Sequence, residues 1–382
     1  MRKIVTILFV AFVLLFGTQR AFAQTAAKET YLKGTVENII SQGTNQTGGV
    51  TTAFQKLAVK LQNGNNVTIT DEGDPQTLQR YNINETVIID ESTSPDGKTT
   101  FVISDRYRLT NLFLLFVAFF LITLAIAGRK GAGAVLGILI SLSVIIFYIV
   151  PQIVFSHQNP LTTSIIGSLV ILFVTTFLAH GFSKQTVVAV AATFCTLFAA
   201  VFFASVFTDS AKLFGLGSDD IALLQLTPGL SIDPKGILLG GIIIGTLGAL
   251  NDVTTTQVAT VFGLSSVDKT QHIFTLVKRS LTIGKEHIVS LVNTLVLAYA
   301  GTSIPIFIFL VINPQHIPYW VIINSESFAD EIVRTLAGSL SLMLAVPIAT
   351  VLAAVVIEYM KNSTDRGGSK NQKIPQPLPT KH

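Results

Sequence analysis

Charged residues are scarce in this chain. Only 13% of its 382 residues are Asp, Glu, Lys or Arg, whereas soluble domains carry about a quarter. Hydrophobic residues make up 49% of the chain, and the mean hydropathy is +0.60. This composition excludes an ordinary water-soluble globular protein and predicts that most of the chain lies in a lipid bilayer.

Cysteine and catalytic fingerprints are also scarce. Cys195 is the single cysteine, which excludes a disulfide within the chain and a cysteine-based metal site. The sequence has no Walker A loop, and "KEHIV" does not form the His-Glu-x-x-His motif of zinc proteases. An intramembrane aspartyl protease needs two membrane carboxylates, and the sequence offers one at a suitable depth. We therefore predict no enzymatic activity and no cofactor; the sequence leaves open whether the protein binds a metal.

The N-terminus has the pattern of an export signal. Two basic residues precede an apolar run over residues 4–17, and Ala21-Phe22-Ala23 closes the segment. We predict a signal peptide over residues 1–23; the alternative is an uncleaved anchor. Either interpretation places the following segment outside the cytoplasm.

Residues 28–106 have a different texture. Runs such as "FQKLAVKL" and "NVTIT" alternate apolar and polar residues, and turn formers such as "NGNN" separate them. This pattern predicts about five antiparallel strands. We expect a small extracytoplasmic β domain, either OB-like or a sandwich. It shows no basic face with interleaved aromatic residues, so nucleic acid is not an expected partner.

Residues 109–358 are dominated by apolar segments. About seven of them have the roughly 20 residues that a helix needs to cross about 30 Å of hydrocarbon. The loops on one side hold twelve Lys and Arg residues against two on the other, which places the N-terminal domain outside and the C-terminus in the cytoplasm. The predicted fold class is an α-helical integral membrane bundle with an N-terminal β domain.

Two further segments are predicted on the cytoplasmic side. Residues 267–287 place Ile273, Val277 and Leu281 on one stripe, with basic residues off that stripe. This pattern predicts an interfacial helix near anionic headgroups, either a coupling helix or a connector. Residues 361–382 are polar with Pro and Gly and are predicted to be a disordered tail.

The main functional question is raised by "GILLGGIIIGTLGALNDVTTTQ". Its apolar part, Gly236–Leu250, gives about 22 Å of helix, too short for a crossing. The helix either continues through Asn251 and Asp252 or breaks there, with one of them capping a new helix. An ionised carboxylate within the bilayer costs about 3 kcal/mol. Asp252 is therefore a candidate to carry a proton or hold a cation; the alternatives are a helix cap or a packing network.

Polar groups near Asp252 complete the candidate site. Asn251 and Thr254 lie on the same segment, as does Gln257, and Asn293 of the next span is expected at a similar depth. The small residues Gly241, Gly245 and Gly248 are predicted to allow close helix packing. Arg334 lies at the opposite surface, where it either extends to the interface or pairs with Asp330 or Glu331.

Three stretches of sequence resemble a known family. They are "GTLGALNDVTTTQVATVFGL", "SLTIGKEHIVSLVNTLVLAYAGTSIPIFI" and "EIVRTLAGSLSLMLAVPIAT". In these the chain is similar to the YibE/F-like multispanning bacterial membrane proteins over about residues 110–360. The resemblance implies an integral membrane protein with a glycine-rich span leading to Asp252, and it supplies no substrate and no catalytic residues.

Two functions are compatible with these observations. The first is a permease of the bacterial plasma membrane that moves an ion or small solute, with Asp252 as coupling or binding group. The second is an envelope scaffold or accessory subunit that anchors the β domain for an extracytoplasmic protein partner. The expected partners are the lipid bilayer, an unknown solute or ion, and a protein partner or a second copy of the chain.

Overall fold

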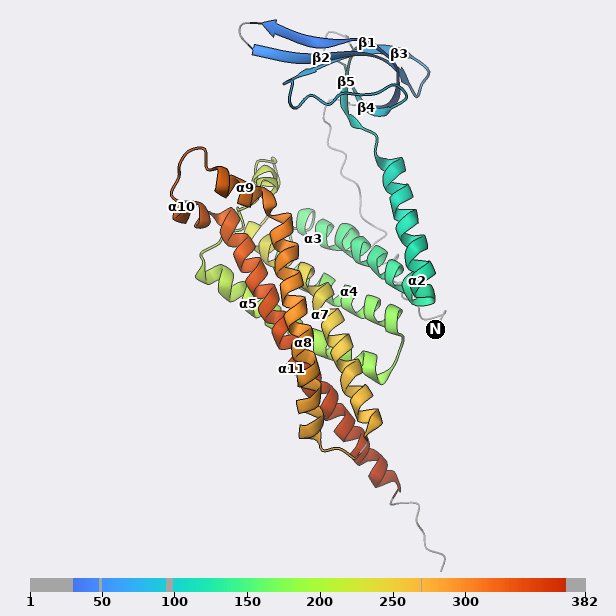
Figure 1. The fold of residues 1–382 in the computed structure, drawn as a ribbon, viewed down its shortest axis with the longest axis vertical. Coiled ribbons are helices and arrows are strands. Elements are labelled where there is room, and N and C mark those ends of the chain that lie inside the picture. Colours follow the sequence, from blue (N-terminus) through green and yellow to red (C-terminus); the bar gives the residue numbers. More distant parts are fainter. Residues whose placement is uncertain (1–29, 48–49, 94–98, 269, 369–382) are drawn as a thin grey trace, which may run out of the picture. The chain divides into compact units, whose positions relative to one another are not determined.

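The computed structural model describes residues 30–47, 50–93, 99–268 and 270–368 (Figure 1). The chain forms two compact units, residues 1–122 and 123–382, and the boundary lies within the first long helix. The predicted signal peptide, residues 1–23, lies outside the described residues.

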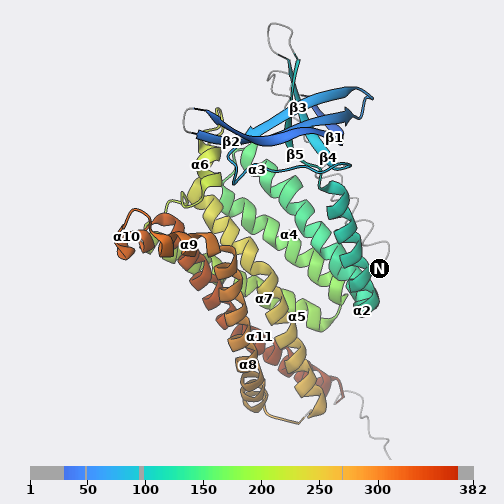
Figure 2. The same ribbon diagram turned by 45° about the horizontal axis from the view of Figure 1, so that its top comes forward.

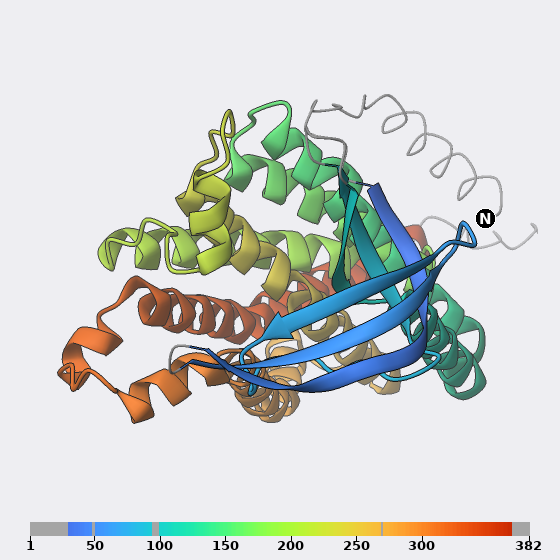
Figure 3. The ribbon, with the colours of Figure 1, turned by 90° about the horizontal axis from the view of Figure 1, so that it is seen from above.

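The first unit contains a five-stranded antiparallel sheet. Its strands are β1 (Thr30–Thr47), β2 (Val50–Leu61), β3 (Asn66–Gly73), β4 (Thr86–Thr93) and β5 (Thr99–Arg106). They are hydrogen-bonded in the order β3-β2-β1-β4-β5, and the edge strands β3 and β5 also contact each other. The sheet is thus a partly open barrel, as expected for the OB-like alternative and not for a sandwich. Figure 3 shows the long, curved strands β1 and β2.

Alternating apolar residues form the interior of this barrel. Val36, Leu57, Val59 and Ile89 are fully buried, because every second side chain of a strand faces the same side of the sheet. Gly34 of β1 lies so close to this core that an added Cβ would be 2.5 Å from Ile89 Cδ1. The sheet therefore closes tightly only with glycine at this position.

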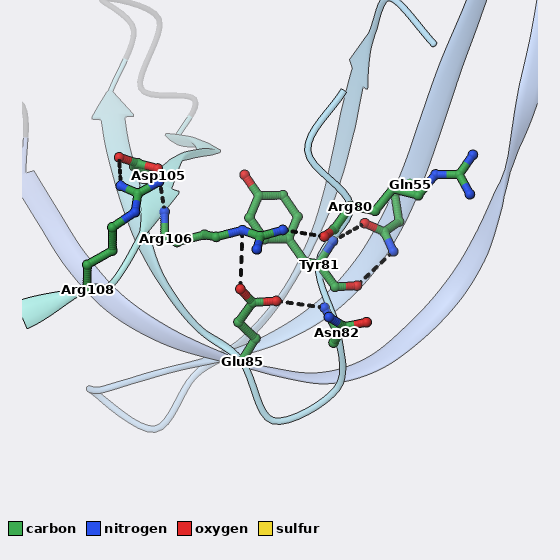
Figure 4. Close-up of polar contacts among 8 residues, drawn as sticks. All are labelled: Gln55, Arg80, Tyr81, Asn82, Glu85, Asp105, Arg106 and Arg108. Carbon is green, nitrogen blue, oxygen red and sulfur yellow. Dashed lines mark hydrogen bonds and ion pairs between the residues drawn. The ribbon is translucent and has the colours of Figure 1, made fainter. Parts of the chain in front are cut away.

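A polar network attaches the segment between β3 and β4 to β2 and β5 (Figure 4). The buried amide of Gln55 donates to the Tyr81 carbonyl (3.0 Å), and the Tyr81 N–H donates back to Gln55 Oε1 (2.8 Å). Arg106 donates to the Arg80 carbonyl (2.5 Å) and pairs with Glu85 (3.2 Å). Burial raises the pKa of Tyr81, with the charge of Asp71 as a smaller cause. These contacts pin a segment that has no strand of its own.

Seven helical segments in the described part of the chain are long and apolar enough to cross a membrane. The helices are α2 (Leu109–Val144), the π-helix η1 (Ile145–Ile149), α3 (Val150–Val154), α4 (Pro160–His180), α5 (Lys184–Ser210), α6 (Asp219–Gln225), α7 (Pro234–Val267), α8 (Ile273–Thr302), α9 (Ile304–Ile312), α10 (Tyr319–Ile323) and α11 (Glu326–Gly368). Gly128, with φ 56°, kinks α2 and separates its two spans. The predicted membrane bundle with an N-terminal β domain is confirmed.

The interior of the helical unit is built around α7. This helix contacts α4, α5, α8 and α11, and Figure 2 shows it passing between α4 and α8. In α5, α7 and α11, about half of the residues in the most apolar stretch of the helix are buried. In α8 only 6% of them are buried. One core cluster joins Ala189 and Ala192 of α5, Val258 of α7, Leu276 of α8 and Ala349 of α11. Small residues on α5 and α11 allow these helices to approach α7 closely.

Two predicted boundaries differ in the structure. Residues 267–287 do not form a separate helix, because α8 begins at Ile273 and continues without interruption to Thr302. Its basic residues therefore belong to the first turns of a spanning helix, and their position at the membrane surface stays a prediction. The first part of the predicted tail, residues 361–368, is helical, since α11 continues to Gly368; residues 369–382 lie outside the described residues.

Candidate functional site

The helix α7 is continuous through the polar segment of the sequence. It runs from Pro234 to Val267 over 34 residues, which corresponds to about 51 Å of helix. Asp252 lies close to its midpoint, more than ten residues from either end. The interpretation that Asn251 or Asp252 caps a new helix is therefore wrong. The apolar stretch ends before Asn251 because polar side chains follow it within the same helix, not because the helix ends there.

The face of α7 toward α4 and α5 contains paired neutral polar groups. The Thr176 hydroxyl donates to Asn251 Oδ1 (2.8 Å), and the hydroxyls of Thr193 and Thr254 lie 2.5 Å apart. Thr176, Thr193 and Thr254 are fully buried. Two of the predicted site residues, Asn251 and Thr254, thus connect α7 to neighbouring helices, which satisfies their polar groups away from water.

Gln257 connects α7 to two further helices. Its Nε2 donates to the Ser280 carbonyl of α8 (3.0 Å) and to the Thr350 hydroxyl of α11 (2.7 Å). An added Cβ at Gly284 would lie 2.8 Å from Gln257 Oε1, so glycine is what admits the amide between the helices. The sequence identified Gln257 as a polar residue near Asp252 but did not predict this role. Its partners are a backbone carbonyl and a hydroxyl that lie far away in the chain.

A different face of α7 is open within the helical unit. It carries Gly241, Gly245, Gly248, Asp252 and Thr256, which recur every three or four residues and are all exposed. We call this set the open face. Around an added Cβ at Gly241 or Gly248 no atom lies within 4 Å, and at Gly245 the nearest is the Tyr299 hydroxyl at 3.0 Å.

The predicted close packing at these three glycines is therefore found at Gly245 alone. The tight contact lies on the side toward α4, at Gly240, whose added Cβ would be 2.3 Å from Ser164 Oγ. The spacing of the glycines in the sequence showed that one face of α7 carries small residues. Which glycines meet a neighbour depends on where α4 and α8 lie around the helix.

Asp252 occupies the open face between α4 and α8. His180, at the end of α4, lies close enough to Asp252 to interact with it electrostatically. Contacts of α7 with α8 at Gly245 and Gln257 lie on either side of Asp252 along the helix. They put Asn293 within about one turn of the depth of Asp252. In the part of the chain that the structure describes, no hydrogen bond joins Asp252 to Asn293, and both side chains are exposed.

Comparison with known proteins gives one match. A sequence model of the YibE/F-like protein family matches residues 115–359. The chain belongs to the YibE/F-like family. No curated protein matches, and no solved structure matches.

The family region contains the open face of α7 and both of its neighbours. It begins within the first span and ends near the end of α11, so it includes Asp252 and Asn293 and leaves out the β domain. The family description names no substrate, and the chemistry of the site therefore depends on the residues described above.

Proposed function

We propose that this YibE/F-like protein is a permease that moves an ion or small solute across the plasma membrane of a bacterium. Asp252 is the coupling or binding group. The observation that carries the proposal is the position of this carboxylate, at the middle of an unbroken spanning helix and on its open face. We assign no enzymatic step to the chain.

The physical argument concerns the charge of Asp252. A carboxylate at the centre of a bilayer costs about 2.5–3.5 kcal/mol, and such groups in known proteins face a cavity or a partner. The three glycines of the open face precede Asp252 along α7. They leave room for water, a solute or a helix, since they carry no side chain. A carboxylate next to such space can take up and release a proton or a cation.

The orientation of this proposal follows from charge. The excess of Lys and Arg in one set of loops favours an extracytoplasmic β domain and a cytoplasmic C-terminus. In this orientation α7 begins at the extracytoplasmic side and α8 begins at the cytoplasmic side. Solute would pass between these two ends of the bundle.

The test begins with growth profiling of a deletion strain against metals, acids and antibiotics, which identifies a phenotype. Full-length wild type, Asp252→Asn and Asp252→Glu are then returned to this strain. We expect Asp252→Asn to abolish complementation at unchanged protein level and Asp252→Glu to retain part of it. Asp209→Asn is the matched control, because Asp209 is an exposed carboxylate paired with Lys235 at a helix end. Full complementation by Asp252→Asn would remove the proposal.

The scaffold function is a second candidate, favoured by the β unit. This unit has its own hydrophobic core and a pinned connecting segment, so it can present a fixed surface to a protein partner. Deletion of residues 28–106 distinguishes the two functions. A scaffold loses all activity on this deletion, whereas a permease whose path lies in the helical unit retains transport in a flux assay.

A further inference from the structure

A second group of carboxylates lies at the end of the bundle where α11 begins. Glu326, Asp330 and Glu331 occupy its first two turns, and Arg334 follows one turn later. We call the three acids the α11 carboxylates. They are far from the open face of α7 in sequence, and the function proposed above does not use them.

The loop after α5 folds onto two of these acids. The backbone N–H groups of Phe214 and Leu216 both donate to Glu326 Oε1, at 2.6 and 3.0 Å. The N–H of Gly217 donates to Asp330. Glu326 thus accepts two N–H groups of the loop, and Asp330 accepts one. The loop therefore closes over the start of α11 through hydrogen bonds to two of its acidic side chains.

Two glycines make this closure possible. Gly215 has φ +78°, a conformation that other residues rarely adopt, and it packs against the Pro234 carbonyl. At Gly217 an added Cβ would lie 2.4 Å from Asp330 Oδ2. The backbone can reach Asp330 only because position 217 has no side chain.

Asp330 itself is left with an unsatisfied oxygen. The residue is only 7% exposed, and in the described part of the chain its Oδ1 has no hydrogen-bond partner. A buried ionised carboxylate needs several donors or a paired cation, and without them it is strongly unfavourable. One N–H group does not meet this need.

Neighbouring charges do not neutralise Asp330. The charged groups that act on it are Glu326, Glu331 and Arg334, so two of the three are acids. Arg334 forms its ion pair with Glu331 (3.6 Å), which confirms one of the pairings expected from the sequence. From α8, the titratable Tyr299 interacts with Arg334 and Glu331. The loop segment 213–217 has no charged side chain and contributes backbone groups alone.

We propose that Asp330 is a proton-binding site at this end of the bundle, and that the 213–217 loop closes over it only while the proton is bound. On ionisation the proton passes to water, and the bare carboxylate must gain water molecules, which opens the loop. A proton fits this site better than a metal ion, because no group of three or more His, Cys, Asp or Glu residues in the described chain has metal-binding geometry. The proposal does not depend on the transport assigned to Asp252.

Infrared difference spectroscopy on the full-length protein in liposomes tests the protonation. Wild type minus Asp330→Asn is expected to show the carbonyl stretch of a protonated carboxyl group in mild acid, which disappears as the pH is raised to mildly alkaline values. Asp219→Asn, at an exposed helix start, is the control and is expected to remove only carboxylate bands. A difference spectrum with carboxylate bands alone throughout this range would overturn the proposal.

Hydrogen exchange tests the loop in the wild type, with Asp330→Asn for comparison. After correction for intrinsic exchange, the amides of Phe214, Leu216 and Gly217 in the wild type are expected to lose at least tenfold protection as the pH rises over the same range. In Asp330→Asn, a neutral mimic of the protonated acid, protection is expected to stay constant. Constant protection in the wild type would show that the loop does not respond to the proton, and would likewise overturn the coupling.

Discussion

The two faces of α7 differ in whether their polar side chains are hydrogen-bonded to neighbouring helices. On the packed face, Asn251, Thr254 and Gln257 are neutral and each bonds to a neighbouring helix. On the open face, Asp252 is an ionisable group whose side chain is exposed within the described helical unit. Neutral groups that find partners stabilise a bundle, whereas a charge without one is available for binding. Stability and proposed function thus occupy different sides of one helix.

Adjacent glycines offer the sharpest test of this comparison. Gly240→Val would force a side chain onto Ser164 Oγ, since even a Cβ would be 2.3 Å away. We expect a loss of about 1–3 kcal/mol in the free energy of unfolding. At Gly241, one residue along on the open face, an added Cβ would have no described atom within 4 Å, and Gly241→Val is expected to change stability by less than about 0.5 kcal/mol. Thermal unfolding of the purified proteins in detergent measures both, and equal losses would contradict the two-face description.

Removal of the Gln257 amide is expected to have an effect of similar size. Gln257→Ala removes both hydrogen bonds and leaves the Thr350 hydroxyl and the Ser280 carbonyl buried without this partner. We expect a loss of about 1–3 kcal/mol. Thr256→Ala, on the exposed side of the same turn, is the control and should be nearly neutral. If Gln257→Ala were as stable as wild type by the same unfolding measurement, the amide would not hold α8 to α7.

A smaller effect is expected at the hydroxyl pair between α5 and α7. Thr254→Val keeps the shape of the side chain but removes the contact with Thr193 (2.5 Å). Hydrogen bonds between membrane helices contribute about 0.6 kcal/mol on average, so a loss of that order is expected. Thr193→Val in the same background should add almost nothing, and additive losses from the two variants would show that the hydroxyls act separately.

The smallest effect concerns the β unit, where a surface ion pair lies at the end of β5 (Figure 4). The hydrogen bond from Arg108, and then the Arg106 N–H, lower the pKa of the Asp105 carboxyl below its ordinary value of 3.8. A lowered carboxyl pKa adds stability above the ordinary value, and this stability is lost as the pH falls through the folded-state pKa.

Hydrogen exchange of residues 99–106 in the full chain measures this effect. Protection in the wild type should fall below about pH 4, whereas Asp105→Asn should remove this dependence and leave exchange at neutral pH little changed. Unchanged acid sensitivity in Asp105→Asn would assign it to another carboxyl group.

Much of the fold could be predicted from local patterns. Apolar segments of about 20 residues mark the spans because each must cross the same hydrocarbon thickness, and alternation marks the strands because side chains point to opposite faces of a sheet. The continuity of α7 through Asn251 could not be predicted, since a short apolar run is compatible with both a break and a polar helix interior. The start of α8 was missed for the same reason: a basic amphipathic turn can belong to a surface helix or to a span.

The sequence alone determined that this is a multispanning membrane protein with a β domain before the spans and an acidic residue, Asp252, in one of its long apolar segments. Hydropathy and length fix these features because the bilayer acts on every segment alike. Only the tertiary structure decided which groups around that residue are partnered. The bond of Gln257 to Thr350 and the closure of Gly217 over Asp330 join segments about a hundred residues apart. Which distant residues form such contacts depends on how the helices pack, and a local sequence pattern does not contain this information.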